Sequence, residues 1–150
     1  LRAKLVELLQ TFDAIGLARH LLRSIRSGAL ATLDPEDGTP FASLVTIATD
    51  VDGTPLMLLS RLSAHTRNLL KDPRASLLFS AGGKGDPLAH PRLTLQCTAE
   101  SVERDSDSHQ RLRARFLARH PKAQLYIDFP DFSLWATKSQ ASTFTCPPRS

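Results

Sequence analysis

The sequence predicts a mainly β protein, a small antiparallel barrel with peripheral helices folded as one domain over residues 1–150. Three observations support this fold class. Six short segments are apolar or alternate between apolar and polar residues. Turn-forming residues connect several of them. A length of 150 residues suits one hydrophobic core, and strands this short bury their edges most simply by closing on themselves.

The N-terminal part, residues 1–27, is predicted to form two helices that precede the barrel. In residues 2–11 and just beyond, apolar side chains recur along one side: Leu5, Leu8, Leu9 and Phe12. In residues 17–27 the same spacing recurs at Leu21, Leu22 and Ile25. Gly28 then stands where a left-handed residue commonly ends a helix.

The barrel itself is predicted over residues 28–146, with further helices inserted between its strands. The six strands are expected at 29–33, 41–49, 56–60, 74–80, the alternating segment from Leu93 through Leu95 and Cys97 to Ala99, and 133–145. Helices are expected at 64–71, before Asp72-Pro73, and at 105–119, before Pro121. Residues 81–91 hold three glycines and two prolines and are expected to form a loop.

The strand at 56–60 also bears on assembly. It is apolar almost throughout, which is typical of a strand that is buried on both faces. A barrel of this size covers only the inner face with its own lumen. The sequence therefore predicts a homodimer, in which a second copy of the chain covers the outer face.

Composition excludes several functional classes. A net charge of +4 suits anionic small molecules but falls short of the dense basic patch of a nucleic-acid-binding protein. No apolar run approaches the roughly 18 residues of a membrane span, and no signal-peptide core is present, so we expect a cytoplasmic protein. Cys97 and Cys146 lie far apart, with no histidine at metal-ligand spacing, so no metal site is expected.

The segment from Leu58 to Leu69 is the most informative for chemistry. A strand ends and a helix begins there, and polar side chains crowd the junction: Ser60, Arg61, Ser63, His65, Thr66 and Arg67. A helix N-terminus has free backbone N–H groups and a partial positive charge, which together with arginine and hydroxyl donors suit a phosphate. The alternative is that Ser63 simply caps the helix and the arginines are solvated.

This junction and several other segments resemble the pyridoxamine 5′-phosphate oxidase-like, FMN-binding split-barrel superfamily, and most of all its haem-utilisation branch. The similar segments span roughly residues 18–136. They are the junction, 27–33, 41–46, 72–78, 85–88, 92–95 and 118–121, the last ahead of Tyr126 and Phe132. The resemblance implies an antiparallel Greek-key split β-barrel that works as a homodimer.

The resemblance also implies a cofactor site, with FMN at the dimer interface and its phosphate at the junction. The phosphate contacts would come from Ser60, Arg61, Ser63, His65 and Thr66, with Asn68 nearby. Ser43, Val45 and Thr46 would lie along the flavin and offer backbone groups to its ring edge. Arg92 would reach the flavin, and Trp135 would lie near the ring from the partner subunit.

Three departures from the family pattern bear on activity. Ala64 stands where a basic residue is common. The strand from Trp135 to Gln140 lacks the Arg-x-His pair with which the oxidase holds its substrate. Residues 142–148 replace the glycine-rich Gly-Phe-Gly end of the haem-utilisation branch.

Three functions remain open from the sequence. The first is an FMN-dependent oxidoreductase acting on a small-molecule substrate, in which the flavin supplies the redox chemistry. The second is a haem-binding or haem-degrading protein, in which the same cleft takes a porphyrin, Arg92 meets its propionates and His90 is a candidate iron ligand. The third is a dimeric split barrel that binds no cofactor and serves as a binding module.

Overall fold

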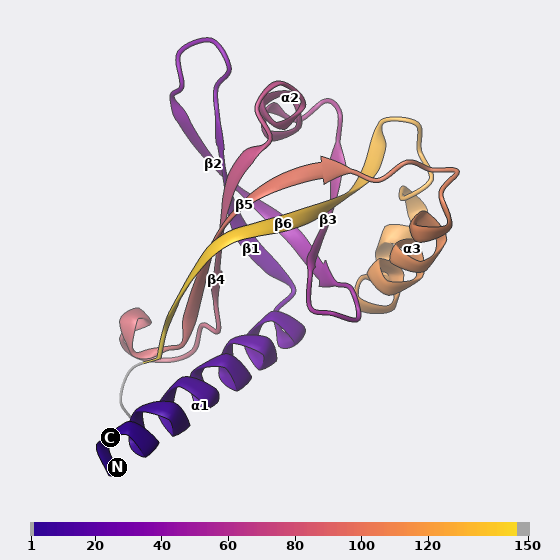
Figure 1. The fold of residues 1–150 in the computed structure, drawn as a ribbon. Helices are drawn as coiled ribbons and strands as arrows, with labels where there is room; N and C mark the ends of the chain where they lie inside the picture. The colour runs from indigo at the N-terminus through magenta and orange to yellow at the C-terminus, as the bar shows by residue number, and fades with distance from the viewer. Residues whose placement is uncertain (1, 147–150) are drawn as a thin grey trace.

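The computed structural model describes residues 2–146, and the side chains from residue 13 onward. Six strands form a closed antiparallel barrel in the order β1-β2-β3-β6-β5-β4 (Figure 1). Their bounds are β1 Ser27–Leu33, β2 Pro40–Thr49, β3 Pro55–Ser60, β4 Arg74–Ser80, β5 Arg92–Ser101 and β6 Phe132–Thr145. This confirms the predicted mainly β, antiparallel barrel with peripheral helices.

The N-terminal segment is one helix, α1 (Arg2–Ser24), and the prediction of two helices over residues 1–27 was wrong. Gly16 lies inside α1 and does not break it, because one glycine costs a helix only about 1 kcal/mol. The predicted apolar stripe from Leu5 to Phe12 falls outside the described side chains.

Gly28 was predicted to end the helix, but it lies in β1. A Cβ atom added there would approach the Phe79 ring to 3.0 Å and the Leu78 carbonyl oxygen to 3.1 Å. The position therefore needs glycine because β4 packs closely against it, and not because the backbone turns.

Two α-helices are inserted between the strands, close to their predicted places. α2 (Ala64–Lys71) follows β3, and α3 (Asp107–Arg119) follows β5. The Ser106 side chain caps α3 by accepting a hydrogen bond from the His109 N–H, so this helix begins two residues later than predicted. Short 3-10 turns, η1 (Pro87–Ala89) and η2 (Pro121–Leu125), complete the chain.

The barrel lumen holds the larger of two hydrophobic clusters. Leu30, Met57, Leu77 and Phe79 are fully buried there, and Trp135 is 2% exposed. Leu21 of α1 packs against the same cluster, which ties the C-terminal end of α1 to the barrel. Burial of apolar surface at about 25 cal/mol per Å² makes this cluster the main source of stability.

The second cluster lies between α3 and the outer face of β3. Leu56 and Leu58 of β3 pack there with Leu112 and Phe116 of α3. Helix α3 of the same chain thus covers the face that was predicted to need a second copy of the chain. The reasoning from β3 to a homodimer was wrong for this reason, although this finding leaves dimerisation itself untested.

Among the described residues, no helix has the length and apolar character needed to cross a membrane.

Candidate functional site

The predicted junction lies where β3 ends and α2 begins, beside the β1–β2 hairpin (Figure 1). Its loop is fixed to the segment before β6. The Arg61 N–H donates to the Asp131 carbonyl at 2.7 Å, and Ser60 Oγ donates to Asp131 Oδ2 at 3.2 Å. Ser60 Oγ also accepts the Leu62 N–H at 3.2 Å. Ser60 therefore holds the loop in shape, which leaves Arg61 to project from it.

Ser63 occupies the N-cap position of α2, but its side chain makes no capping hydrogen bond. The capping part of the alternative is therefore wrong, whereas its other part, that the arginines are solvated, agrees with the exposure of Arg61. Arg61 is exposed, and no described residue forms a hydrogen bond or ion pair with its side chain. The junction thus combines a hydroxyl and a guanidinium that are available to a ligand with the positive end of a helix.

His65 and Ser43 come from separate segments and meet at this junction. Ser43 Oγ lies 3.0 Å from His65 Nδ1. Burial lowers the pKa of His65, so the imidazole is neutral at pH 7. The bond to Ser43 fixes the ring orientation, and Nε2 has no hydrogen-bond partner among the described residues. A neutral, oriented imidazole with one open nitrogen can donate to an anion or bind a metal ion.

Thr66 and Asn68 face the protein more than they face solvent. Thr66 is 3% exposed, and its hydroxyl has no partner among the described residues. Asn68 is 8% exposed, and its Nδ2 donates to Thr32 Oγ1 at 3.1 Å, which ties α2 to β1.

The edge of β2 supports the predicted backbone contacts along a cofactor. Residues 40–46 of β2 pair only with β1, while β3 pairs with β2 only from Ile47 to Thr49. One backbone edge of residues 40–46 therefore lacks a strand partner in the described part of the chain. Val45 points into the lumen and Thr46 is exposed, so the Thr46 side chain and the free edge are accessible, whereas the Val45 side chain is not.

Arg92 and Trp135 do not join the junction within one chain. Arg92 begins β5, opposite Ser80 at the far end of β4, so it lies at the other end of the barrel from α2. Its guanidinium donates to the Leu88 carbonyl at 3.0 Å. Trp135 lies in the lumen core. One chain thus brings together Ser43, Ser60, Arg61, Ser63 and His65, with Thr66 and Asn68 behind them.

His90, the candidate iron ligand, and Cys97 both lie away from this junction. His90 packs against Gly83, and its Nε2 lies 3.0 Å from the Lys84 carbonyl. Cys97 is buried, and burial raises the pKa of its thiol to about 11, as expected of an inert buried cysteine. The described residues contain no cluster of three potential metal ligands.

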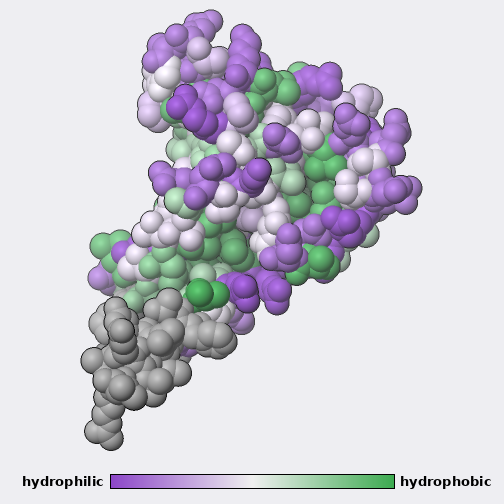
Figure 2. Space-filling view, viewed as in Figure 1, coloured by the Kyte–Doolittle hydropathy of each residue, from purple (hydrophilic) through white to green (hydrophobic). Residues whose placement is uncertain are grey.

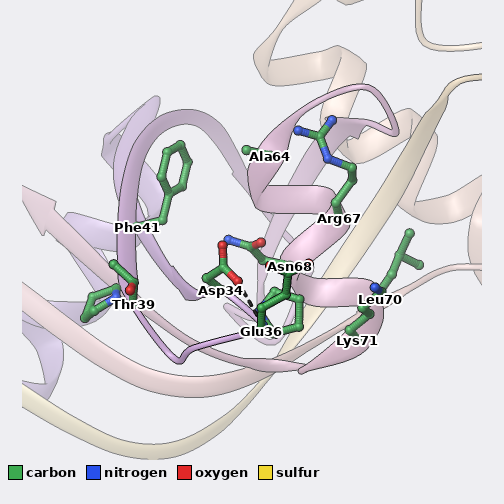
Figure 3. A pocket seen from close by; sticks show the side chains of 11 residues that line it. Asp34, Glu36, Thr39, Phe41, Ala64, Arg67, Asn68, Leu70 and Lys71 are labelled. Carbon is green, nitrogen blue, oxygen red and sulfur yellow. Dashed lines mark hydrogen bonds between the residues drawn. The ribbon is translucent and has the colours of Figure 1, made fainter.

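Sequence reasoning missed a pocket of about 480 Å³ between the β1–β2 turn and α2 (Figure 3). Asp34 and Glu36 of the turn line one side, Arg67 and Lys71 of α2 line another, and Phe41 of β2 lines the side away from Arg67 and Lys71 in this view. The four-residue spacing of Arg67 and Lys71 was the available signal, because it places both on one face of a helix.

Sequence reasoning also missed an apolar strip on the outer face of the sheet. Leu44 of β2 and Leu78 of β4 both lie opposite Ala29 of β1, and they are 78% and 44% exposed. On the face drawn in Figure 2, apolar surface also gathers over the lower parts of the strands, beside the grey segment. Near this strip, a cavity of about 640 Å³ is lined by residues that include Ala31, Ala75 and Cys97.

The family model described as "Pyridoxamine 5'-phosphate oxidase" matches residues 16–146. The protein named "Non-canonical heme oxygenase HOZ, chloroplastic", from Arabidopsis thaliana, is 34% identical over 116 residues, which are 77% of this chain and 35% of the plant protein.

Two solved structures at 38% identity share the fold. A heme-binding protein from Mycobacterium smegmatis superimposes with a TM-score of 0.81, covering 88% of this chain and 53% of that chain. A protein of unknown function from Agrobacterium tumefaciens superimposes with a TM-score of 0.82, covering 89% of this chain and 57% of that one. The chain thus spans about a third of the plant relative and little more than half of these two structures.

Proposed function

Because the chain belongs to the pyridoxamine 5′-phosphate oxidase family, we propose that the junction of β3 and α2 binds a planar, anionic cofactor, and that this cofactor is haem. Two relatives that are 34% and 38% identical to this chain carry heme in their names. Both are longer than this chain, so haem binding or haem degradation by this chain is our proposal.

The geometry of His65 carries the proposal. Metal-bound histidines are neutral and are oriented by a hydrogen bond to their second ring nitrogen. His65 meets both conditions, since burial lowers its pKa and Ser43 lies on its Nδ1. Its Nε2 would bind the iron, while Arg61 and Ser63 would hold a propionate. When bound, haem supplies redox chemistry at its iron, and this chain supplies orientation and charge.

A spectrum tests the proposal directly. Addition of hemin to the purified protein is expected to give a Soret band that saturates with haem. His65→Ala is expected to shift the band and weaken binding. His90→Ala is the matched control, because it removes a histidine whose Nε2 already lies against the Lys84 carbonyl. A band that His90→Ala abolishes and His65→Ala leaves unchanged would overturn the role of His65.

FMN is the second candidate, and a specific observation favours it. The uncapped N-terminus of α2 and the Ser63 hydroxyl suit a phosphate dianion, and the free edge of β2 suits a flavin ring edge. Bound FMN would make the protein yellow and give flavin absorption bands. Arg61→Gln is expected to weaken FMN binding by about 1.5–3 kcal/mol. Oxidoreductase activity on a small-molecule substrate would then follow. If both the Soret band and the flavin bands are absent after reconstitution, the cofactor-free binding module is favoured.

We further propose that the chain is a homodimer joined through the apolar strip of Leu44, Ala29 and Leu78. Exposed leucines next to a small residue make a flat surface that a second copy can cover. Sedimentation of the purified protein measures its oligomeric state, and a stable monomer at micromolar concentration would contradict the proposed dimer.

A cytoplasmic location stays a prediction.

A further inference from the structure

The pocket between the β1–β2 turn and α2 has opposite charges on its two walls, and they do not pair with each other. Asp34 and Glu36 lie on the turn, and Arg67 and Lys71 lie on α2 (Figure 3). The three ion pairs among the described residues all lie elsewhere. The pocket of about 480 Å³ therefore separates a negative wall from a positive wall.

The Asp34 side of the negative wall is held in place by hydrogen bonds within its own turn. The Asp34 N–H donates to the Thr39 carbonyl at 2.9 Å, and the Gly38 N–H donates to the Asp34 carbonyl at 2.8 Å. Asp34 Oδ1 accepts the Glu36 N–H at 2.8 Å. These bonds fix the backbone of the turn and the Asp34 carboxylate, whereas the exposed Glu36 carboxylate makes no hydrogen bond within the described residues.

Asn68 places a fixed acceptor in the pocket. Its Nδ2 is used by Thr32 Oγ1, so the amide orientation is set. Its side-chain carbonyl oxygen has no hydrogen-bond partner in the described part of the chain and reaches solvent, although the residue as a whole is only 8% exposed. An acceptor that is fixed in orientation and accessible from the pocket can take a hydrogen bond from a donor of a ligand.

The positive wall and the aromatic ring complete the set of groups. Arg67 donates one bond, to the Leu62 carbonyl at 2.6 Å, and keeps further donors free. Phe41 is 40% exposed and gives the pocket an apolar side that also attracts cations through its ring face. Acceptors and an aromatic ring suit an ammonium group, and the basic wall suits a carboxylate.

We propose that this pocket binds a small zwitterion of the α-amino-acid class with an apolar side chain. The ammonium group lies against Asp34, Glu36 and the Asn68 carbonyl oxygen. The carboxylate lies toward Arg67 and Lys71, and the apolar side chain packs on Phe41. This site is distinct from the proposed cofactor contacts at Arg61, Ser63 and His65, and it does not depend on which cofactor binds there.

Titration with phenylalanine, followed by amide chemical shifts of the whole chain, tests the proposal. Saturable shifts are expected in residues 34–41 and 64–71 at concentrations up to about 10 mM, where a site with a Kd near 1 mM fills. Phenethylamine and 3-phenylpropionate each carry one of the two charges, and each is expected to bind at least about threefold more weakly. Absence of saturable shifts, or equal binding of the three compounds, would overturn the proposal.

Variants separate the two walls. Glu36→Gln and Lys71→Gln change exposed residues, and each is expected to weaken phenylalanine binding by about three- to tenfold. Glu103→Gln and Lys138→Gln are the matched controls, because they remove the same charges from exposed positions outside the pocket. Equal binding by the Glu36 and Lys71 variants and their controls would show that the charged walls do not hold the ligand. Repeating the titration with Arg61→Gln separates this site from the cofactor site, and unchanged phenylalanine binding is expected.

Discussion

The corner of the barrel under α3 and the corner beside α2 are both rich in polar side chains, yet they use them differently. The arginines of the α3 corner are engaged within the protein. Arg111 and Arg113 form ion pairs with Asp50 and Asp128, and Arg115 donates to the Thr49 carbonyl. Arg119 donates to three carbonyls at the C-terminal end of α1, those of Leu22, Arg23 and Ile25.

The α2 corner leaves polar groups without partners within the described residues. The Arg61 guanidinium, the Ser63 hydroxyl and His65 Nε2 are all open there. Arg61 is exposed and Ser63 and His65 are half-buried, so these three groups face solvent at one place and are accessible to a ligand. The comparison teaches that a cluster of basic residues alone does not identify a binding surface, because the more arginine-rich corner is the structural one.

The largest effect is expected from breaking the apolar contact under α3. Phe116 is fully buried between α3 and β3. Phe116→Ala is expected to lower the free energy of unfolding by about 3–5 kcal/mol, because it leaves a cavity. Urea unfolding followed by circular dichroism measures the change. A loss below 1 kcal/mol would mean that α3 does not cover β3 tightly.

Arg119 tests whether the arginines of the α3 corner are structural. Arg119→Gln removes the hydrogen bonds to the end of α1 and is expected to lower the free energy of unfolding by about 2 kcal/mol. Arg61→Gln is the matched change in the α2 corner, and its free energy of unfolding is expected to stay within about 0.5 kcal/mol of that of the wild type. The same urea experiment compares them, and equal losses would erase the distinction between the two corners.

Much of the fold could be predicted from the sequence because strand signals are local. The alternation from Leu93 to Ala99 reports a strand with one buried face, and β5 has that pattern. The junction was also visible, since Ser60, Arg61, Ser63 and His65 lie within six residues of one another.

The remaining features depend on contacts between distant residues. Asp131 fixes Ser60 from 71 residues away, and Arg119 meets α1 from more than 90 residues away. Sequence spacing gives no signal for such pairs. The same limit explains the error about β3, because its apolar pattern shows that both faces are covered but not that α3 covers the outer one.

A smaller effect is expected on the surface that α3 leaves uncovered. Leu44 is 78% exposed, so Leu44→Asp should change the stability of one chain by no more than about 0.5 kcal/mol. If the strip of Leu44, Ala29 and Leu78 is the dimer interface, the same change should weaken dimerisation at least about tenfold. Sedimentation equilibrium measures this, with Leu125→Asp as a control on another exposed leucine. Unchanged dimerisation in Leu44→Asp would move the interface elsewhere.

The smallest effect concerns the protonation of His65 in the α2 corner. Burial lowers the pKa of His65 below the ordinary value of 6.5. Just below pH 6.5, the imidazole therefore binds a proton in the unfolded chain but not in the folded chain. The free energy of unfolding should therefore fall as the pH drops from about 7 to about 5. His65→Gln should remove part of this decline, while His109→Gln should remove only the separate part that arises because burial also lowers the pKa of His109. Urea titrations at several pH values measure both slopes, and an unchanged slope in His65→Gln would show that the imidazole is not held neutral by the fold.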